Sequence, residues 1–268
     1  MNPEDYIRYR ELPLINLGQN TIFRNVYVFE KMDGANAQVR CIDGKITPGS
    51  RGKPISTGAF NRPWKLNFYN WTHTIPEFQS IPPTWIVYGE WLSPHTMGYD
   101  EFAKNNFYLI DLLDLTLPKP FVPYEYAIEI LSAKNLIAED RVRTIPFIKG
   151  GRIDSETIKN WTQQSHFYDG PMEGVVIKDY TSQTFLKYLT PQFSEVRYNS
   201  NISAEQKYIT LRRLEKICQA LQDDEEPVDL ATVTREVDKV LRRENGVALP
   251  KQVVEERVKD LWLPNSDN

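Results

Sequence analysis

Apolar, β-branched runs that carry or end in charged residues constrain the fold of this chain more strongly than any other feature of its sequence. Four such runs span 84–91, 107–114, 172–178 and 184–189, and a further apolar run, 26–29, is followed by Glu30 and Lys31. Runs of this length and composition are typical of buried strands. An unpaired charge is expensive to bury. Four such strands therefore predict sheets that border a polar cleft.

The pattern changes from strand to helix after about residue 200. Apolar residues recur at helical spacing in three stretches, which span 204–221, 230–241 and 251–262. An acidic run ending in Pro227 and the pair Asn245-Gly246 separate these stretches. We therefore expect an α+β chain, with a first domain over residues 1–200 and a small all-helical domain over 201–268.

Composition narrows the class of protein. A chain of 268 residues is long enough for a large domain and a small one, and its net charge of −4 offers no general footprint for nucleic acid, so such contacts need a local patch. Cys41 and Cys218 lack zinc-site spacing, which favours a reducing compartment. No run has membrane-spanning length and the first residues lack a secretory pattern, so we expect a soluble, cytoplasmic protein without membrane contact.

The segment Lys31-Met32-Asp33-Gly34 allows two interpretations. Asp-Gly favours the positive φ angles of a hairpin turn, with Lys31 as one solvated charge among many. Alternatively, Lys31 is a nucleophile that attacks the α-phosphate of a nucleotide and forms a lysyl-nucleoside monophosphate. A free lysine has a pKa of about 10.4, so this second interpretation requires partial burial or neighbouring cations, such as a bound metal ion, to lower it. The second Asp-Gly pair, Asp43-Gly44, is flanked by two short alternating runs and predicts a plain hairpin turn.

Other polar residues also have alternative roles. The basic loop that contains Ser50, Arg51 and Lys53 is either solvated surface or a set of donors for phosphates. Glu90, at the end of a buried run, binds a ribose hydroxyl or pairs with a lysine.

The aromatic stretch 61–83 has few basic residues, which favours core packing over base stacking.

No histidine has a ligand partner nearby in the sequence. His73, His95 and His166 are isolated from one another, so a metal-histidine site is not expected.

Taken in order, the motifs resemble those of the covalent nucleotidyltransferase superfamily, which contains ATP-dependent DNA ligases, RNA ligases and messenger-RNA capping enzymes. They comprise Lys31-Met32-Asp33-Gly34, Tyr88-Gly89-Glu90, Phe107 to Asp111, Glu173 to Lys178, and Lys187. The RNA ligase branch is the most similar, because Glu30 precedes the lysine, Asn36 closes the first motif and Phe193-Ser194-Glu195 follows the last lysine. The helical tail also favours this branch, since DNA ligases and capping enzymes normally carry an OB-fold there.

This resemblance implies an ATP-grasp-like ligase domain, with antiparallel sheets around a nucleotide cleft. It implies that Lys31 takes AMP from ATP within the motif that includes Asp33 and Gly34, and that Glu90 holds the ribose.

Further roles follow from the resemblance alone. Asn36 and Arg51 would face the phosphates or the acceptor end, and Glu30 would help to recognise adenine. Glu173 would position Mg²⁺ or Mn²⁺, and Lys178 and Lys187 would contact the α-phosphate.

Two positions depart from the family pattern. Ile110 stands where a phenylalanine usually stacks on adenine, so an aliphatic face would pack the base. Leu189 stands where a second lysine is usual, which removes one cation from the phosphate site. From these two departures we expect weaker or altered self-adenylylation.

The first functional hypothesis is an ATP-dependent RNA ligase, a monomer that seals RNA 5′-phosphate and 3′-hydroxyl ends, including those of nicked duplexes, in RNA repair. The second is a ligase-fold protein with another acceptor, such as DNA, or a capping activity that uses GTP. The third is a degenerate nucleotide- or RNA-binding module, motivated by Ile110 and Leu189.

Overall fold

The computed structural model describes residues 6–56, 62–93, 97–194, 203–224 and 226–262. The chain divides into two compact units, Met1–Tyr188 and Leu189–Asn268. The boundary expected between residues 200 and 201 lies outside the described residues.

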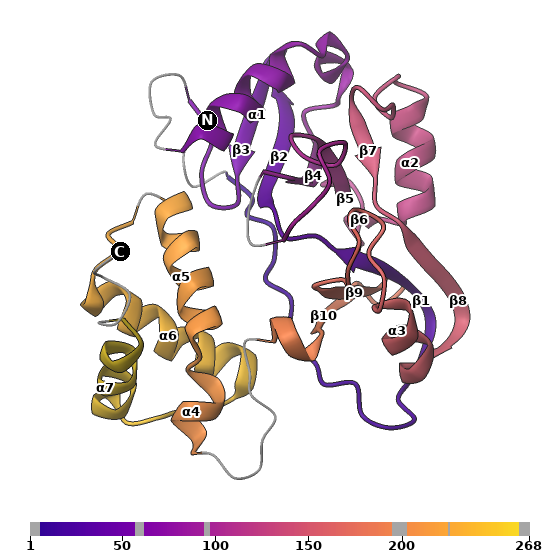
Figure 1. The fold of residues 1–268 in the computed structure, drawn as a ribbon. Helices are drawn as coiled ribbons and strands as arrows, with labels where there is room; N and C mark the ends of the chain where they lie inside the picture. Colours follow the sequence, from indigo (N-terminus) through magenta and orange to yellow (C-terminus); the bar gives the residue numbers. More distant parts are fainter. Residues whose placement is uncertain (1–5, 57–61, 94–96, 195–202, 225, 263–268) are drawn as a thin grey trace. The chain divides into compact units, whose positions relative to one another are not determined.

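The first unit contains two largely antiparallel sheets (Figure 1). Sheet A has the strand order β10-β9-β1-β8, with β1 at Ile22–Lys31, β8 at Phe147–Asp154, β9 at Gly174–Asp179 and β10 at Thr184–Leu189. Sheet B has the order β3-β2-β4-β5-β6, and β7 joins it parallel to β5. Its strands are β2 at Ala35–Ile42, β3 at Lys45–Ser50, β4 at Trp85–Trp91, β5 at Phe107–Asp114, β6 at Phe121–Val122 and β7 at Val142–Thr144.

Short helices lie between the strands. They are α1 (Pro63–His73), η2 (Pro76–Ser80), α2 (Tyr124–Ser132), α3 (Ser155–Trp161) and, after β10, η3 (Pro191–Phe193). The aromatic stretch that contains α1 belongs to the core, as its composition favours: Phe68 is fully buried and its ring packs against Trp91 and Phe107 of sheet B.

The two Asp-Gly pairs have different structural roles. Asp43 and Gly44 have φ angles of 50° and 71° and connect β2 to β3, so the predicted hairpin turn is confirmed. Asp33-Gly34 connects β1 of sheet A to β2 of sheet B, so the hairpin interpretation of this pair is wrong. Gly34 is required by close approach instead, because a Cβ there would lie 2.7 Å from the carbonyl oxygen of Trp91.

Side-chain alternation gives sheet A two different faces. Val26 and Val28 of β1 face a core that also contains Ile177 and Tyr188. The alternate residues of β1, Tyr27, Phe29 and Lys31, therefore point to the opposite face of the sheet. Phe29 contacts Tyr124 of α2, and Lys178, which lies opposite Tyr27, reaches β5 of sheet B. This second face of sheet A is thus the one directed at sheet B.

The second unit is helical and has its own core. It contains α4 (Ala204–Tyr208), α5 (Leu211–Asp223), α6 (Leu230–Asn245) and α7 (Lys251–Trp262). The helix expected over 204–221 is interrupted at Ile209, and Thr210 caps α5 by accepting a hydrogen bond from the amide of Arg213. Among the helices that the structure describes, none is long and apolar enough to cross a membrane.

Candidate active site

Lys31 is the last residue of β1 and forms an ion pair with Glu173. Its Nζ donates to Oε2 of Glu173 at 2.6 Å. The carboxylate is fully buried, whereas 22% of the lysine side chain is exposed. The register explains the pairing, since Lys31 lies opposite Gly174, the residue after Glu173. A partly accessible amine is therefore held by a buried carboxylate.

Glu90 lies near the same lysine, on β4 of sheet B. Its Oε1 accepts a hydrogen bond of 3.0 Å from the amide of Gly34. Burial raises the pKa of Glu90 to about 7, and the positive charges of Lys31 and Arg51 oppose this rise. Glu90 is therefore within electrostatic range of both cations, while the ion pair that Lys31 forms is with Glu173.

Asn36 and Arg51 each contain a buried polar atom without a partner among the described residues. These atoms are the Oδ1 of Asn36 and the Nε of Arg51. Asn36 lies directly opposite Glu90 in the β2–β4 register. Buried polar atoms in proteins are nearly always hydrogen-bonded. A bound ligand with polar groups would supply the missing partners.

The turn after Lys31 is held by a residue that the sequence did not single out. The amide of Asp33 donates to the hydroxyl of Tyr99 at 2.8 Å. Burial raises the pKa of Tyr99, so the phenol stays neutral at physiological pH. Tyr99 thereby fixes the backbone between the two sheets.

Glu30 lies on the opposite face of β1 from Lys31 and is 2% exposed. Its carboxylate accepts hydrogen bonds from the Ser165 hydroxyl at 2.5 Å and from the backbone N and Nδ1 of His166 at 3.1 and 2.8 Å. This arrangement does not support the expected contact between Glu30 and adenine. Instead, Glu30 anchors the end of β1 to the loop that follows α3.

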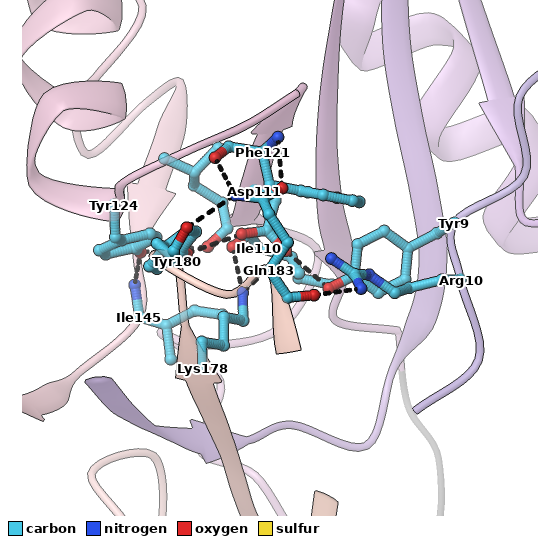
Figure 2. Close-up of polar contacts among 11 residues, drawn as sticks. Tyr9, Arg10, Ile110, Asp111, Phe121, Tyr124, Ile145, Lys178, Tyr180 and Gln183 are labelled. Carbon is cyan, nitrogen blue, oxygen red and sulfur yellow. Dashed lines mark hydrogen bonds and ion pairs between the residues drawn. The ribbon is translucent and has the colours of Figure 1, made fainter. Parts of the chain in front are cut away.

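Lys178 is buried in a network that joins the two sheets (Figure 2). Its Nζ donates to Asp111 at 2.8 Å and to the carbonyl of Ile110 at 2.7 Å. Tyr9 and Tyr180 also donate to Asp111, at 2.6 and 2.7 Å. Burial lowers the pKa of Lys178, and Asp111 opposes that effect.

This network changes the role expected for Lys178. The residue lies on the same face of sheet A as Lys31 but four positions away in the β1–β9 register, since it faces Tyr27. At 3.3 Å per residue that is about 13 Å. The expected contact with the α-phosphate is therefore not supported, because the charge of Lys178 is used to hold sheet A against β5.

Ile110 occupies an irregular position in the sheet. The β4–β5 register shifts between Tyr88 and Gly89, opposite Ile110, and its side chain packs on a cluster that includes Tyr9 and Leu113. An aliphatic surface is therefore present where a phenylalanine is usual, but it is partly covered by this cluster.

Lys187 and Leu189 lie on the face of β10 that Lys31 shares. Their neighbour Tyr188 packs in the core on the far side of sheet A, so alternation directs Lys187 and Leu189 toward the Lys31 face. Strand β9 alone separates β10 from β1. The structure thus brings Lys187 to the same surface as Lys31, while Leu189 is 2% exposed.

No group of three histidine, cysteine or acidic residues able to hold a metal occurs within the described ranges. His95 lies outside them. The Nδ1 of His166 is bonded to Glu30. A metal ion bound at this site would therefore have few protein ligands, and Glu173 would be one of them.

A sequence model of the RNA ligase family matches residues 24–189, a span that contains the five motifs from Lys31-Met32-Asp33-Gly34 to Lys187. The chain belongs to the RNA ligase family. A search of curated proteins finds no match.

Solved structures of Naegleria gruberi RNA ligase are similar to this family member in fold. A variant with ATP and Mn is 17% identical with a TM-score of 0.50, and one with AMP and Mn is 20% identical with a TM-score of 0.49. An apo variant is 21% identical with a TM-score of 0.49. Each alignment covers 63% of this chain, and the chain spans about half the length of those proteins (50–51%).

Proposed function

We propose that this member of the RNA ligase family is an ATP-dependent ligase that joins RNA 5′-phosphate and 3′-hydroxyl ends. In the first step, Nζ of Lys31 attacks the α-phosphorus of ATP, and pyrophosphate leaves. AMP then passes to the RNA 5′-phosphate, which releases Lys31. Finally the RNA 3′-hydroxyl attacks that phosphate and AMP leaves, so each step is a displacement at phosphorus that depends on positioning and charge.

The ion pair between Lys31 and Glu173 carries this proposal. A nucleophilic lysine must be held in one orientation while one side of its amine stays open to the nucleotide. The 2.6 Å bond to a buried carboxylate holds the amine in place, and 22% exposure of the lysine side chain leaves it accessible. The attacking amine must be uncharged, whereas the carboxylate of Glu173 pairs with an ammonium, so the attack also requires a cation that offsets this carboxylate. An ordinary surface lysine would lack the buried partner.

The surrounding residues fit a nucleotide. We assign Glu90 to a ribose hydroxyl, and Asn36 and Arg51 to the phosphates or the acceptor end. Asn36 and Arg51 each have a buried atom that is unpaired within the part of the chain that the structure describes. Asn36 lies opposite Glu90 in the register, and Arg51 lies within electrostatic range of Glu90. Lys187 shares the face of Lys31 and would meet the α-phosphate.

The carboxylate of Glu173 also fits the divalent cation that such a reaction implies. Mg²⁺ in nucleotide sites is usually held by one or two carboxylates and by the substrate phosphates, which matches a single buried carboxylate here. Bound Mg²⁺ or Mn²⁺ would neutralise charge on the phosphates. Glu173 would hold the ion, and the lysine would remain beside it.

Labelling with nucleotides tests the proposal. The protein is incubated with α-labelled ATP or GTP and Mg²⁺, and acid-stable labelled protein is measured for the wild type, Lys31→Ala and Lys45→Ala. Lys45, an exposed residue at the start of β3, serves as the control. We expect label from ATP in the wild type and Lys45→Ala, and none in Lys31→Ala. Label from GTP alone would instead indicate a capping activity, and ATP binding without an adduct would indicate the degenerate module.

The helical unit has a separate role in this proposal. Every motif lies before residue 190, so a chain that ends at residue 200 should still form the adduct but seal nicked or single-stranded RNA poorly. Comparing adduct formation with sealing in the truncated chain tests this division. A folded truncated chain that cannot form the adduct would contradict it.

A further inference from the structure

Residues 6–15, which we call the N-terminal strap, are bonded to both sheets of the first unit. On sheet B, the carbonyl of Ile7 accepts hydrogen bonds from Gln38 at 3.1 Å and from Tyr88 at 2.9 Å. The hydroxyl of Tyr9, which is 5% exposed, donates to Asp111. This part of the strap is therefore fixed to sheet B.

The other end of the strap pairs with sheet A at Lys187. The amide of Ile15 donates to the carbonyl of Lys187 at 2.9 Å, and the amide of Lys187 donates to the carbonyl of Pro13 at 2.9 Å. Leu14 and Lys187 form a parallel bridge. Both backbone polar groups of Lys187 are thus bonded to the strap, which covers the edge of β10.

Arg10 connects the strap to the turn between β9 and β10 (Figure 2). Its guanidinium donates to the carbonyl of Gln183 at 2.7 Å. It packs against the rings of Phe121 and Phe185, 4.2 and 4.0 Å from their centroids, and these two rings also contact each other edge to face, with their centroids 5.1 Å apart. Phe121 belongs to sheet B and Phe185 to sheet A, so one side chain contacts both.

Gln183 completes this link. Its side-chain amide accepts a hydrogen bond from the amide of Phe121 at 3.0 Å and donates to the carbonyl of Phe121 at 2.9 Å. Its φ angle of 58° lies in the left-handed region. The turn is therefore held in one conformation against β6, and Arg10 bonds to the backbone of that same residue.

The position of these bonds matters because β10 is the outermost strand of sheet A. A shift of one residue in an edge strand turns every side chain to the opposite face. Such a shift would turn Lys187 into the core and Tyr188 out of it. The strap prevents the shift at two points, at the turn through Arg10 and at Lys187 itself through the backbone pairing.

We propose that Arg10 is a positioning residue that keeps the Lys187 side chain on the face that carries Lys31. This inference rests on the proposed function, in which Lys187 meets the α-phosphate. Arg10 does not touch the nucleotide. It acts through the register of β10 and through the orientation of the strap.

Single-turnover adenylylation separates positioning from folding. With saturating α-labelled ATP and Mg²⁺, the amplitude reports the folded, competent fraction and the rate constant reports the geometry at phosphorus. We expect Arg10→Leu to keep the amplitude and to slow the rate constant by about 10- to 100-fold, the scale of a misplacement of roughly 1 Å. Arg10→Lys keeps a positive charge against the two rings, so it should recover most of the rate.

Arg8→Leu is the matched control on the same strap. The Arg8 side chain is 47% exposed and forms an ion pair with Glu11. We expect its rate constant and amplitude to match the wild type. If Arg10→Leu does not fold, Arg10→Gln, which keeps a donor for Gln183 but no charge, takes its place under the same criteria.

Three results would overturn the inference: an unchanged rate constant in Arg10→Leu, a loss of amplitude without a change in rate constant, or equal slowing in Arg8→Leu. A wild-type protein that forms no adduct would overturn the proposed function itself. Because that result appears in the wild type, the two failures are distinguishable.

Discussion

The Nζ of Lys31 lies 2.6 Å from Oε2 of Glu173, which joins the end of β1 to the residue that precedes β9. The two residues are 142 positions apart in the chain. If one partner loses its charge, the charge of the other is left unpaired, and an unpaired buried charge lowers the stability of the folded protein. The pair therefore connects the stability of sheet A with the chemistry proposed for Lys31.

Glu173→Gln should slow adduct formation strongly while the protein stays folded. The amide still accepts a hydrogen bond from Lys31 but offers no charge to a divalent cation. We expect adenylylation to be about 10²- to 10³-fold slower, which corresponds to roughly 3 to 4 kcal/mol. The measurement is the rate of labelling over a titration of Mg²⁺, with exposed Glu129→Gln as the control. Identical metal titrations for the wild type and Glu173→Gln would rule out the metal role.

Glu90→Gln should change the pH dependence of stability. The folded pKa of about 7 exceeds the ordinary value of 4.5, so between these values the folded protein keeps a proton that the unfolded chain loses. Stability should therefore fall as pH rises through this window, by on the order of 1 to 3 kcal/mol, and level off above pH 7. Denaturant unfolding at pH 5 and pH 8 should show this loss in the wild type and a smaller one in Glu90→Gln. Equal losses would show that Glu90 does not titrate in this range.

The same substitution should weaken the preference for a ribose. A charged acceptor for a hydroxyl contributes about 1.5 to 3 kcal/mol, and the amide replaces it only in part. Labelling with ATP and with 2′-deoxy-ATP should therefore differ less in Glu90→Gln than in the wild type. If the wild type uses both nucleotides equally, Glu90 does not bind the ribose.

Gly34→Ala should destabilise the protein and impair adduct formation together. Its Cβ would lie 2.7 Å from the carbonyl oxygen of Trp91 and 2.8 Å from Cγ of Glu90, so β4 would have to move. We expect a loss of about 1 to 3 kcal/mol, as in overpacked cores, and slower labelling because Glu90 is displaced.

Gly44→Ala provides the comparison for Gly34→Ala. Gly44 has a φ of +71° and no atom within 4 Å of the added Cβ, so the cost there is backbone strain alone. Thermal melting should detect both variants, whereas only Gly34→Ala should slow labelling. Equal labelling rates in the two variants would mean that the approach of β4 to Gly34 does not control the site.

Leu189→Lys tests the departure from the family pattern. Leu189 shares a face of β10 with Lys187, so a lysine there would point toward the same anion and add about 1 to 4 kcal/mol of attraction at intermediate effective dielectric. Adenylylation should then quicken or need less Mg²⁺. Leu189 is 2% exposed, however, so an ammonium without an anionic partner would lower the melting temperature. A stable variant with an unchanged single-turnover rate would show that the phosphate does not lie beneath this strand.

The sequence by itself determined several of the strands and helices and one of the turns. Apolar runs placed β5 and β10 at their observed bounds, 107–114 and 184–189, and helical spacing placed α7 at 251–262. The turn at Asp43-Gly44 followed from local chemistry, because positive φ is a property of the residues themselves. The order of the motifs likewise indicated the family, since it depends on spacing along the chain.

The tertiary structure alone decided which charged residues face one another. Lys178 and Lys187 both lie in short apolar strands, yet Asp111, 67 positions away, holds the first in a buried ion pair, while the second stays on the face of Lys31. Glu30 and Lys31 are neighbours, but alternation sends Glu30 to Ser165, 135 positions along the chain. Partners at such separations are set by how the sheets pack, and periodicity along one strand carries no information about what packs against it. For the same reason, the role proposed for Arg10 depends on the tertiary structure, which brings Phe121 of one sheet and Phe185 of the other into contact with its guanidinium.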